Sequence, residues 1–581
     1  MQRVFNLALH LATGAGLWVL LQGVVGATRW EQEDGQPSEG SLRFAVVAGV
    51  ALFVANPMAV YGVGYLIQRS IVMATCFSVW SLVAVLAAAR GRGLAWLAVA
   101  ILLYAMAVLA KEHAVLLPLP ALALYGIVRR PPARVIVGAL AIGLVLVGVL
   151  GAVLASHYTG VVGQVFDERS ARLVAQLDGM QPGVSDDALT LSIVNQAWLF
   201  FRYGLLWVIP NVGWMSVDLR PPFPLSMTEF PQVLGAPLYL AALALSVVAM
   251  VRYRDWRQML GFAAFVPATL FATEFTTVWV QDPFVLYRSY LWAIGVPFLF
   301  AFPFIGIRPR ITVAIAGCLV LLFAGLSFER LRTFRSDATL WRDAAAKHDA
   351  DAPANAVGRG RAYMWRGNDL FVAGLFAGAL EDYTRALAAG EHVGQVQYHR
   401  AAALKMLGEP EAALNALDAS AAAGGDPDKP AAAAFLRAQI LVEQGQPEGA
   451  IAAARQALAL GLDAEEQGLA LTIVAQSSAR LRRHADSVEA YTALLELTPG
   501  SRSARVGRAM GLGAMGRREE AVADLDSVLA QGDGADVRFG RAMLFLADGR
   551  KGEALVEARK ALAFKPGDPS LSALVAQLER Q

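Results

Sequence analysis

Cysteine is scarce in this sequence, with Cys76 and Cys318 as the two cysteines among 581 residues. Both lie in apolar stretches, so we expect packing residues rather than a disulfide. The seven histidines lack the spacing of metal ligands, and we predict no structural metal. A formal net charge of +2 provides no basic excess, and we predict no nucleic-acid partner. The sequence therefore shows no sign of a disulfide, a structural metal site or a nucleic-acid-binding surface.

Apolar residues are abundant, but mainly in the first part of the chain. They make up 56% of all residues, and the mean hydropathy of +0.47 is too high for a soluble enzyme of this length. From about residue 352 the composition becomes that of an ordinary soluble protein, rich in Ala, Leu, Glu and Arg. We predict an all-α chain with a polytopic membrane domain at 1–330, a linker helix at 331–351 and a repeat domain at 352–581.

About ten stretches of mostly apolar residues are long enough to be membrane spans. They lie at 4–27, 43–57, 70–89, 94–110, 114–128, 135–156, 235–251, 258–273, 288–306 and 311–327. An eleventh stretch, 194–210, would invert the charge pattern of the connectors if it crossed fully. We therefore expect a re-entrant or broken helix that ends at Pro210.

Basic residues cluster in the connectors on one side of the predicted membrane domain. They are Arg90, Arg92, Arg129, Arg130, Arg134, Arg252, Arg254, Arg257, Arg308 and Arg310. The positive-inside rule assigns this side to the cytoplasm, so we expect a multi-pass protein of a bacterial inner membrane. The opposite, periplasmic side then holds the 157–193 loop and the repeats. It also holds Met1. Either an upstream helix and outer loop are missing from this chain, which is the alternative we favour, or the first span is inserted by another route.

A recurring pattern organises the second part of the chain. Its phase is set by Gly374, Gly408, Gly445, Arg483, Gly516 and Gly549, at spacings of 34, 37, 38, 33 and 33 residues. Five positions later stand Ala379, Ala413, Ala450, Val488, Ala521 and Ala554. This pattern is typical of about six tetratricopeptide repeats (TPRs), hairpins of two closely crossing helices.

A TPR groove binds extended peptides in many unrelated systems, so we predict a protein or peptide ligand without identifying it. The predicted first helices of the repeats carry Arg361, Tyr398, Arg400, Arg437, Arg505, Arg508, Arg538 and Arg541. These residues favour acidic or polar peptide segments. The alternative is that they only make the surface soluble.

Three polar interruptions lie in otherwise apolar sequence between Arg43 and Pro120: Asn56-Pro57, Gln68-Arg69 and Lys111-Glu112-His113. Ionisable groups are costly at membrane depth, so each is a candidate functional site. The alternatives are structural. Gln68-Arg69 would cap a helix or snorkel to the interface, and Lys111-Glu112-His113 would neutralise itself there.

Four motifs occur in a fixed order along the chain. They are Asn56-Pro57 followed by Gln68-Arg69, then Ala110-Lys111-Glu112-His113-Ala114-Val115-Leu116-Leu117-Pro118, then Tyr287-Arg288-Ser289-Tyr290-Leu291, then Leu340-Trp341-Arg342-Asp343 ahead of the repeats. Together they resemble the transmembrane-and-TPR O-mannosyltransferases and their bacterial relatives. The resemblance implies a C-type (GT-C) glycosyltransferase that takes a sugar from a polyprenyl-phosphate donor on the non-cytoplasmic face.

The chain departs from that family in three places. Asn56 stands where the family usually has His, and Tyr287 where it more often has an acid. In the family, a helix and an outer loop with the catalytic aspartate precede the segment that resembles Phe5-Asn6-Leu7-Ala8-Leu9-His10-Leu11, which here follows Met1 almost directly. The resemblance and the topology therefore both predict a missing N-terminal piece.

The resemblance and the chemistry of glycosyl transfer suggest roles for individual residues. Such a transfer needs cations at the leaving phosphate and a carboxylate that takes the hydroxyl proton. We predict Arg69, Lys111 and Arg288 as the phosphate-binding cations. Supporting residues are Asn56, Gln68, His113, Tyr287 and Tyr290. The catalytic residue is unknown, and Glu112, Asp218 and Asp282 are weak candidates. We predict no metal and no cofactor besides the lipid-linked donor.

Two other classes of function fit the same features. The first is a non-enzymatic, membrane-anchored TPR scaffold for envelope protein assembly, in which the polar interruptions serve only folding. The second is a transporter or polysaccharide polymerase, which also holds lipid-linked phosphates with arginines. The sequence does not identify the sugar, the acceptor or the polyprenol.

The connector charges give a testable topology. A reporter that is active only outside the cytoplasm should work when fused after Arg342 and fail when fused after Arg130, because the basic connectors stay inside. Activities of the two fusions, normalised to their expression, check this expectation. The opposite pattern would contradict both the topology and an extracytoplasmic lipid-linked donor.

Overall fold

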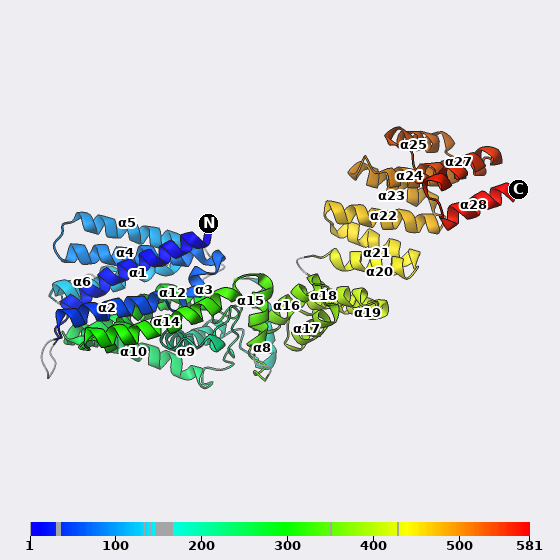
Figure 1. The fold of residues 1–581 in the computed structure, drawn as a ribbon. Coiled ribbons are helices and arrows are strands. Elements are labelled where there is room, and N and C mark those ends of the chain that lie inside the picture. Colours follow the sequence, from blue (N-terminus) through cyan, green and yellow to red (C-terminus); the bar gives the residue numbers. More distant parts are fainter. Residues whose placement is uncertain are drawn as a thin grey trace. The chain divides into compact units, whose positions relative to one another are not determined.

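The computed structural model describes residues 2–30, 37–132, 134–135, 138, 141–143, 145, 167–348, 351–426 and 429–580. The described residues are helical apart from turns, loops and one isolated antiparallel bridge between Leu219 and Phe284. The chain divides into two compact units, unit 1 at Met1–Arg366 and unit 2 at Gly367–Gln581 (Figure 1). The all-helical class predicted from the sequence is confirmed for these residues.

Unit 1 is a helical bundle in which most of the long helices are apolar, whereas α8 and α15 are polar on part of their surface. Its longer helices are α1 (Gln2–Ala27), α2 (Glu39–Val54), α4 (Arg69–Ala89), α5 (Ala95–Ala110), α6 (Pro118–Arg129), α8 (Glu168–Met180), α9 (Ala188–Val208), α10 (Gly235–Arg252), α11 (Trp256–Phe271), α14 (Pro309–Thr333) and α15 (Asp337–Ala346). Short helical turns link them, among them α3 (Ala59–Val63), η2 (Glu112–Leu116), η5 (Ala272–Thr276) and η6 (Leu286–Arg288).

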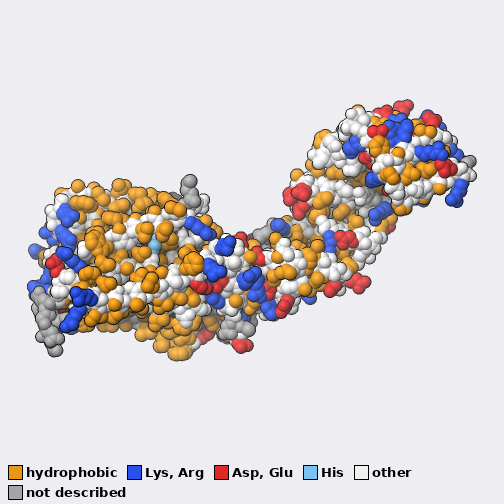
Figure 2. Space-filling view, viewed as in Figure 1, with side chains coloured by type: hydrophobic (Ala, Val, Ile, Leu, Met, Phe, Trp, Pro, Cys, Tyr) orange, Lys and Arg blue, Asp and Glu red, His pale blue; other side chains and the backbone are white. Residues whose placement is uncertain are grey.

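Five helices among the described residues are long and apolar enough to cross a membrane: Gln2–Ala27, Leu66–Ala89, Gln232–Arg252, Trp256–Thr276 and Pro309–Thr333. Ala95–Ala110 is a shorter apolar helix. Figure 2 shows a broad apolar surface on unit 1, with Lys and Arg gathered at the end where α4 turns into α5. Membrane insertion of about ten spans stays a prediction.

Several segments differ from their expected form. Most of the stretch 194–210 lies in α9, which is continuous up to Val208 and stops just before Pro210, where the sequence predicted its end. A break within this helix is not seen, and a re-entrant position stays a prediction. The 157–193 stretch is not only loop, because α8 and the start of α9 lie in it. Residues 157–166 and most of the predicted span 135–156 lie outside the described residues.

The predicted span 288–306 is not one helix. It consists of η6, α12 (Ser289–Trp292), η7 (Ala293–Gly295), α13 (Val296–Ala301) and η8 (Phe302–Phe304). Gly295 lies so close to the Ala263 carbonyl that a side chain there would clash with it. Pro297 and Pro303 add breaks, because proline lacks the N–H of a continuous helix.

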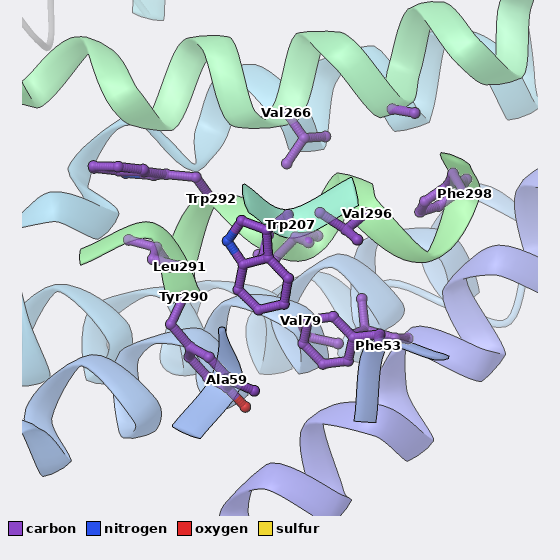
Figure 3. Close-up of a cluster of buried hydrophobic side chains, with 14 of the residues drawn as sticks. Phe53, Ala59, Val79, Trp207, Val266, Tyr290, Leu291, Trp292, Val296 and Phe298 are labelled. Carbon is purple, nitrogen blue, oxygen red and sulfur yellow. The ribbon is translucent and has the colours of Figure 1, made fainter. Parts of the chain in front are cut away.

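This broken segment lies in the core of unit 1 (Figure 3). Phe53 of α2 stacks on Trp207 of α9 with ring centroids 5.6 Å apart. The Tyr290 hydroxyl lies 2.5 Å from His10 Nδ1, and His10 Nε2 lies 3.0 Å from the Val54 carbonyl oxygen. His10 is therefore a core residue with partners for both ring nitrogens, and Tyr290 contacts it rather than a ligand cavity.

The repeats form six helical hairpins and a terminal helix. The pairs are α16 (Gly360–Val372) and α17 (Phe376–Ala388), α18 (Val393–Met406) and α19 (Pro410–Ala422), α20 (Ala432–Glu443) and α21 (Pro447–Leu460), α22 (Ala464–Arg480) and α23 (His484–Leu497), α24 (Arg502–Ala514) and α25 (Arg518–Gln531), α26 (Ala535–Ala547) and α27 (Lys551–Phe564), and then α28 (Pro569–Arg580). The predicted solenoid of about six TPR-like hairpins is confirmed.

The repeat phase predicted from the sequence was wrong by one residue in the fourth hairpin. Elsewhere a glycine with positive φ stands two residues before the second helix, as Gly408 does before Pro410. Before α23 this position is Arg482, with φ 56°, rather than Arg483. The small residue at the corresponding position is accordingly Ser487, which is fully buried, and Val488 beside it is also buried. An arginine in the left-handed conformation gives no signal in the sequence.

The crossing points predict a contrast between two alanines of α21. Ala450 is fully buried, whereas Ala452 is exposed. In the fragment 352–581, which we expect to fold alone, Ala450→Leu should lower the free energy of unfolding by about 1–3 kcal/mol because the crossing has no space for it. Urea unfolding followed by circular dichroism measures this loss. Ala452→Leu is the matched control, and equal losses would contradict the crossing geometry.

Candidate functional site

The candidate site lies at one end of unit 1, where several helices stop. α4 begins at Arg69 and α5 ends at Ala110, and the two helices pack side by side across a short turn at residues 90–94 (Figure 1). Arg69 and Lys111 are therefore at the same end of the pair. α11 reaches this end as well, and η5 with Glu274 packs near η2 because both adjoin α11.

Five ionisable residues form a continuous chain at this end, which we call the acid-base chain. Lys111 Nζ lies 2.9 Å from Glu112 Oε1, and His113 Nδ1 lies 3.1 Å from the same oxygen. His113 Nε2 lies 2.9 Å from Glu274 Oε1, and Arg288 Nη1 lies 3.1 Å from Glu274 Oε2. The acid-base chain extends from the surface into the interior, because the Glu112 side chain is 72% exposed and the Glu274 side chain is 1% exposed.

The Arg288 guanidinium has three kinds of contact: an ion pair, an aromatic ring and a backbone carbonyl. Besides its ion pair with Glu274, its guanidinium lies 3.6 Å from the centroid of the Trp279 ring. Nη1 also donates to the Asp282 carbonyl oxygen at 3.4 Å. Arg288 is buried, so it is not an arginine that snorkels to water. A buried guanidinium without these partners would carry a large desolvation cost.

His113 connects the two carboxylates. Burial alone lowers the pKa of a histidine, but hydrogen bonds to Glu112 and Glu274 outweigh burial and raise the pKa of His113 above its ordinary value. A raised pKa favours the cationic imidazole, which lies within ion-pair distance of both carboxylates. Glu274 thus lies between two basic groups, His113 and Arg288.

Arg288 lies at the end of a segment, Thr277–Ser289, that we call the strap. One face of α9 holds the strap through four side chains. Ser192 accepts from Trp279 N at 2.9 Å, Gln196 donates to Pro283 O at 2.7 Å, Tyr203 accepts from Val285 N at 2.8 Å, and Trp207 donates to Ser289 Oγ at 3.0 Å. Residues 192, 196, 203 and 207 recur at helical spacing, so a single face of α9 sets the path of the strap.

A second ionic cluster, away from α9, contacts the strap at Gln281 and Asp282. Arg220 pairs with Asp218 at 2.6 Å and donates to the Gln281 carbonyl oxygen. Arg361 pairs with Asp282 at 3.0 Å. Burial alone raises the pKa of a carboxyl, but the charge of Arg220 and the nearby His348 imidazole hold the pKa of Asp218 well below its usual range. Asp218 is therefore a poor proton acceptor.

The other predicted site residues lie in different surroundings. Arg69 stacks on the Phe5 ring at 5.6 Å and forms no ion pair within the described part of the chain, and its Nε lacks a hydrogen bond. Gln68 is half-buried just before it. Asn56 is buried, donates to Trp207 O at 2.9 Å and accepts from Met58 N at 3.0 Å, so it shapes a turn. Tyr287 is half-buried beside Tyr65.

The structure thus brings Lys111, Glu112, His113 and Arg288 together and leaves Asn56 and Tyr290 in the core. Sequence reasoning assigned no role to Glu274, Trp279 or the strap-binding residues of α9. Glu274 had a signal, since it is the one acidic residue in the apolar segment Trp256–Thr276. Among the described residues, no group of three His, Cys, Asp or Glu is placed to hold a metal ion.

An apolar cavity of about 350 Å³ is lined in part by the two helical turns that carry residues of the acid-base chain, although none of the five ionisable residues lines it. It is lined by Leu116, Leu119, Ile193, Ala197, Ala236, Tyr239, Leu240, Leu243, Thr269, Ala272 and Phe275. Leu116 belongs to η2, which carries Glu112 and His113, and Phe275 follows Glu274 directly in η5. The same two turns therefore supply the wall of the cavity and the carboxylates of the chain.

The arginines predicted for the repeat groove are largely neutralised by carboxylates of unit 2. Arg437 pairs with Asp418 at 2.5 Å, Arg508 with Asp524 at 2.7 Å, and Arg541 with Asp526 at 2.8 Å. Arg538 pairs with both Asp533 and Glu557. These pairs give the cations a structural role and weaken the expectation of an acidic peptide ligand.

Comparisons with known proteins identify the repeats. The tetratricopeptide repeat family matches residues 405–465, 435–502 and 506–569. No curated protein matches the chain. Similar solved structures include a tetratricopeptide repeat protein from Parabacteroides merdae (19% identity, 42% of this chain and 92% of that one, TM-score 0.27). Others are YrrB, described as a TPR protein with an unusual peptide-binding site (19%, 34% and 98%, TM-score 0.29), and Pseudomonas aeruginosa PilF (19%, 38% and 97%, TM-score 0.30). The C-terminal region is built from tetratricopeptide repeats, modules that mediate contacts between proteins.

The two carboxylates that hold His113 should differ in their importance for stability. Glu274→Ala leaves Arg288 and His113 buried without that partner, and we expect a loss of about 3–5 kcal/mol. Glu112→Ala removes an exposed carboxylate and should cost about 1 kcal/mol or less. Thermal unfolding of the purified proteins in detergent measures both. Equal effects of the two substitutions would contradict the central place of Glu274.

Proposed function

We propose that this protein is a membrane glycosyltransferase that uses a polyprenyl-phosphate-linked sugar as donor. In this proposal unit 1 spans a bacterial inner membrane and opens its site to the periplasm. The repeats, also periplasmic, bind the protein acceptor or a partner. The motifs that resemble the GT-C family support the proposal from the sequence, and the candidate site supports it from the geometry.

The observation that carries the proposal is the apolar cavity beside the acid-base chain. A lipid-linked phosphate needs an apolar surface for its prenyl chain and polar groups for its headgroup within a few ångströms of each other. The turns η2 and η5 provide both, because each has residues in the cavity wall and in the acid-base chain. Leu240 of α10 lines the cavity and is strongly exposed, so the cavity adjoins the apolar surface.

The cations differ in their availability for the phosphate. Arg288 is paired with the buried Glu274 and shapes the site. Lys111 pairs with the exposed Glu112, a contact that a phosphate can replace at low cost. Arg69 has no carboxylate partner among the described residues. We therefore assign the phosphate to Arg69 and Lys111, and a supporting place to Arg288.

The proposed transfer follows from these assignments. The bond between the sugar's anomeric carbon and the phosphate oxygen breaks, and a bond forms between that carbon and the acceptor hydroxyl oxygen. The hydroxyl proton passes to a carboxylate, and the polyprenyl phosphate leaves as an anion held by the cations. Of the three acids in unit 1 predicted as weak candidates, Glu112 is the most exposed, although His113 and Lys111 lie against it and lower its pKa. Asp218 and Asp282 are bound by arginines.

A second candidate function is a membrane-anchored TPR scaffold without enzymatic activity. The observation that favours it is the repeat array itself, since the family match covers the repeats alone. In that case the acid-base chain only stabilises unit 1. The two functions differ in whether unit 1 binds a lipid-linked phosphate.

Binding of undecaprenyl phosphate to the purified protein in detergent tests the proposal. We expect Arg69→Ala and Lys111→Ala each to weaken binding about tenfold or more, because a charged contact to the phosphate is lost. Ala236→Phe should weaken binding similarly by filling the cavity. Titration with radiolabelled lipid measures the dissociation constants.

Two control variants accompany this titration. Arg92→Ala removes an exposed arginine at the opposite end of unit 1, and Ala241→Phe enlarges an exposed position of α10. Both should bind like the unaltered protein. Binding of the lipid that is indifferent to all three site variants, or no binding at all, would reject the transferase and leave the scaffold.

A further inference from the structure

Arg361 belongs to α16, the first helix of the first repeat hairpin, yet it lies within unit 1. Its Nη1 lies 3.0 Å from Asp282 Oδ1 and 4.0 Å from Asp218 Oδ1. Its guanidinium also lies over the Trp341 ring, 5.3 Å from the centroid. Arg361, a residue of the first repeat helix, therefore contacts both the strap, through Asp282, and the loop that carries Asp218.

The residues before Arg361 are fixed against the same region. Asn355 is buried, accepts from Phe223 N at 3.0 Å through its carbonyl oxygen, and donates from its side chain to Phe223 O at 2.9 Å. Val357 packs in one apolar cluster with Val278 and Val280 of the strap. The strap is thus enclosed between α9 on one side and residues 355–361 on another.

Asp282 links these contacts to the acid-base chain. Its carboxylate receives Arg361 and, at 3.5 Å, Arg220. Its carbonyl oxygen accepts from Arg288 Nη1 at 3.4 Å. A displacement of Asp282 therefore moves an acceptor of Arg288, the cation that is bonded to Glu274. The path from Arg361 to Arg288 contains a single intermediate residue.

A simple surface ion pair would carry no such consequence. Exposed pairs contribute about 0–1 kcal/mol, and the Asp282 side chain is 38% exposed. The Arg361 side chain is only 24% exposed, however, and it stands between two carboxylates. Without Arg361, Arg220 would be the one arginine between Asp218 and Asp282 among the described residues, and the Asp282 carboxylate would keep only its 3.5 Å contact with Arg220. Weaker attraction and the repulsion between the two carboxylates would then loosen the strap.

We propose that Arg361 is a positioning residue that holds the strap through Asp282 and thereby sets the place of Arg288 in the candidate site. The first repeat helix is then a structural part of this site. The significance of Arg288 for a lipid-linked phosphate rests on the proposed function. The link between Arg361 and the strap is independent of that function, because it rests on the contacts of Asp282.

Hydrogen exchange of the full-length protein in detergent, followed by mass spectrometry, tests this link. The amides of Trp279 and Val285 are bonded to Ser192 and Tyr203, so the strap has protected positions to observe. Arg361→Ala should speed exchange in peptides covering 277–289 about tenfold or more, since a charge-assisted hydrogen bond is lost. Exchange in α10 and in α20 should stay unchanged.

Arg385→Ala is the matched control, because it removes an arginine that pairs with Glu381 on an exposed helical face. It should leave the strap unchanged. Arg361→Lys keeps a cation between Asp282 and Asp218 and should slow exchange again relative to Arg361→Ala, which separates positioning from general misfolding. Unchanged exchange in 277–289 for Arg361→Ala, or faster exchange with Arg385→Ala to the same degree, would overturn the proposal.

Undecaprenyl phosphate titration of the same variants separates this proposal from the proposed function. Faster strap exchange together with weaker binding in Arg361→Ala supports both. Faster strap exchange in a protein that does not bind the lipid at all supports the positioning role and rejects the transferase.

Discussion

The buried carboxylate of Glu274 is the constraint on which the candidate site of unit 1 depends. A buried ionised acid needs compensating charges or hydrogen bonds, and Glu274 has the basic groups of His113 from η2 and Arg288 from the strap beside it. These partners are far apart in the chain, so one carboxylate holds together segments that the helices alone would leave separate. The polar face of α9 has a related effect, since its side chains bond the backbone of the strap and fix Arg288 from behind.

Charge is treated differently at the two ends of unit 1. In the basic connectors, Arg257 pairs with Asp255, but Arg90, Arg92, Arg252 and Arg308 form no ion pair within the described residues. Water or lipid headgroups can solvate them. Arg220, Arg288, Arg330 and Arg361 at the other end all have carboxylate partners. The difference follows from burial, because desolvated cations need partners whereas exposed ones do not. A negatively charged ligand at the second end would therefore meet few uncommitted cations.

The sequence predicted the features with local causes. The repeat phase was visible because positive-φ glycines and small crossing residues are required by the hairpin itself, and it was misplaced only where Arg482 takes the left-handed conformation. The polar turn Lys111-Glu112-His113 was visible for a similar reason, since charge interrupts an apolar run there.

Features that depend on distant contacts were not predicted. Glu274 acquires its importance from Arg288 and from His113, 161 residues away in the sequence, and no spacing encodes that meeting. The breaks between residues 286 and 304 arise partly from the contact of Gly295 with Ala263, although the composition of this stretch is that of a continuous span. The strap-binding side chains of α9 likewise look like ordinary polar residues on a helix until their partners are known.

The position of α16 has a consequence for how such a chain can diversify. The helix runs from Gly360 to Val372, whereas unit 1 ends at Arg366, so its first half packs as part of the bundle. A genetic exchange of repeat arrays joined near residue 352 would therefore import a foreign α16 and lose the native Asn355, Val357 and Arg361 together. An exchange joined after Val372 would keep them all. We therefore expect recombination among related proteins to change the number and type of the later repeats, whereas α16 stays together with the helical bundle of unit 1.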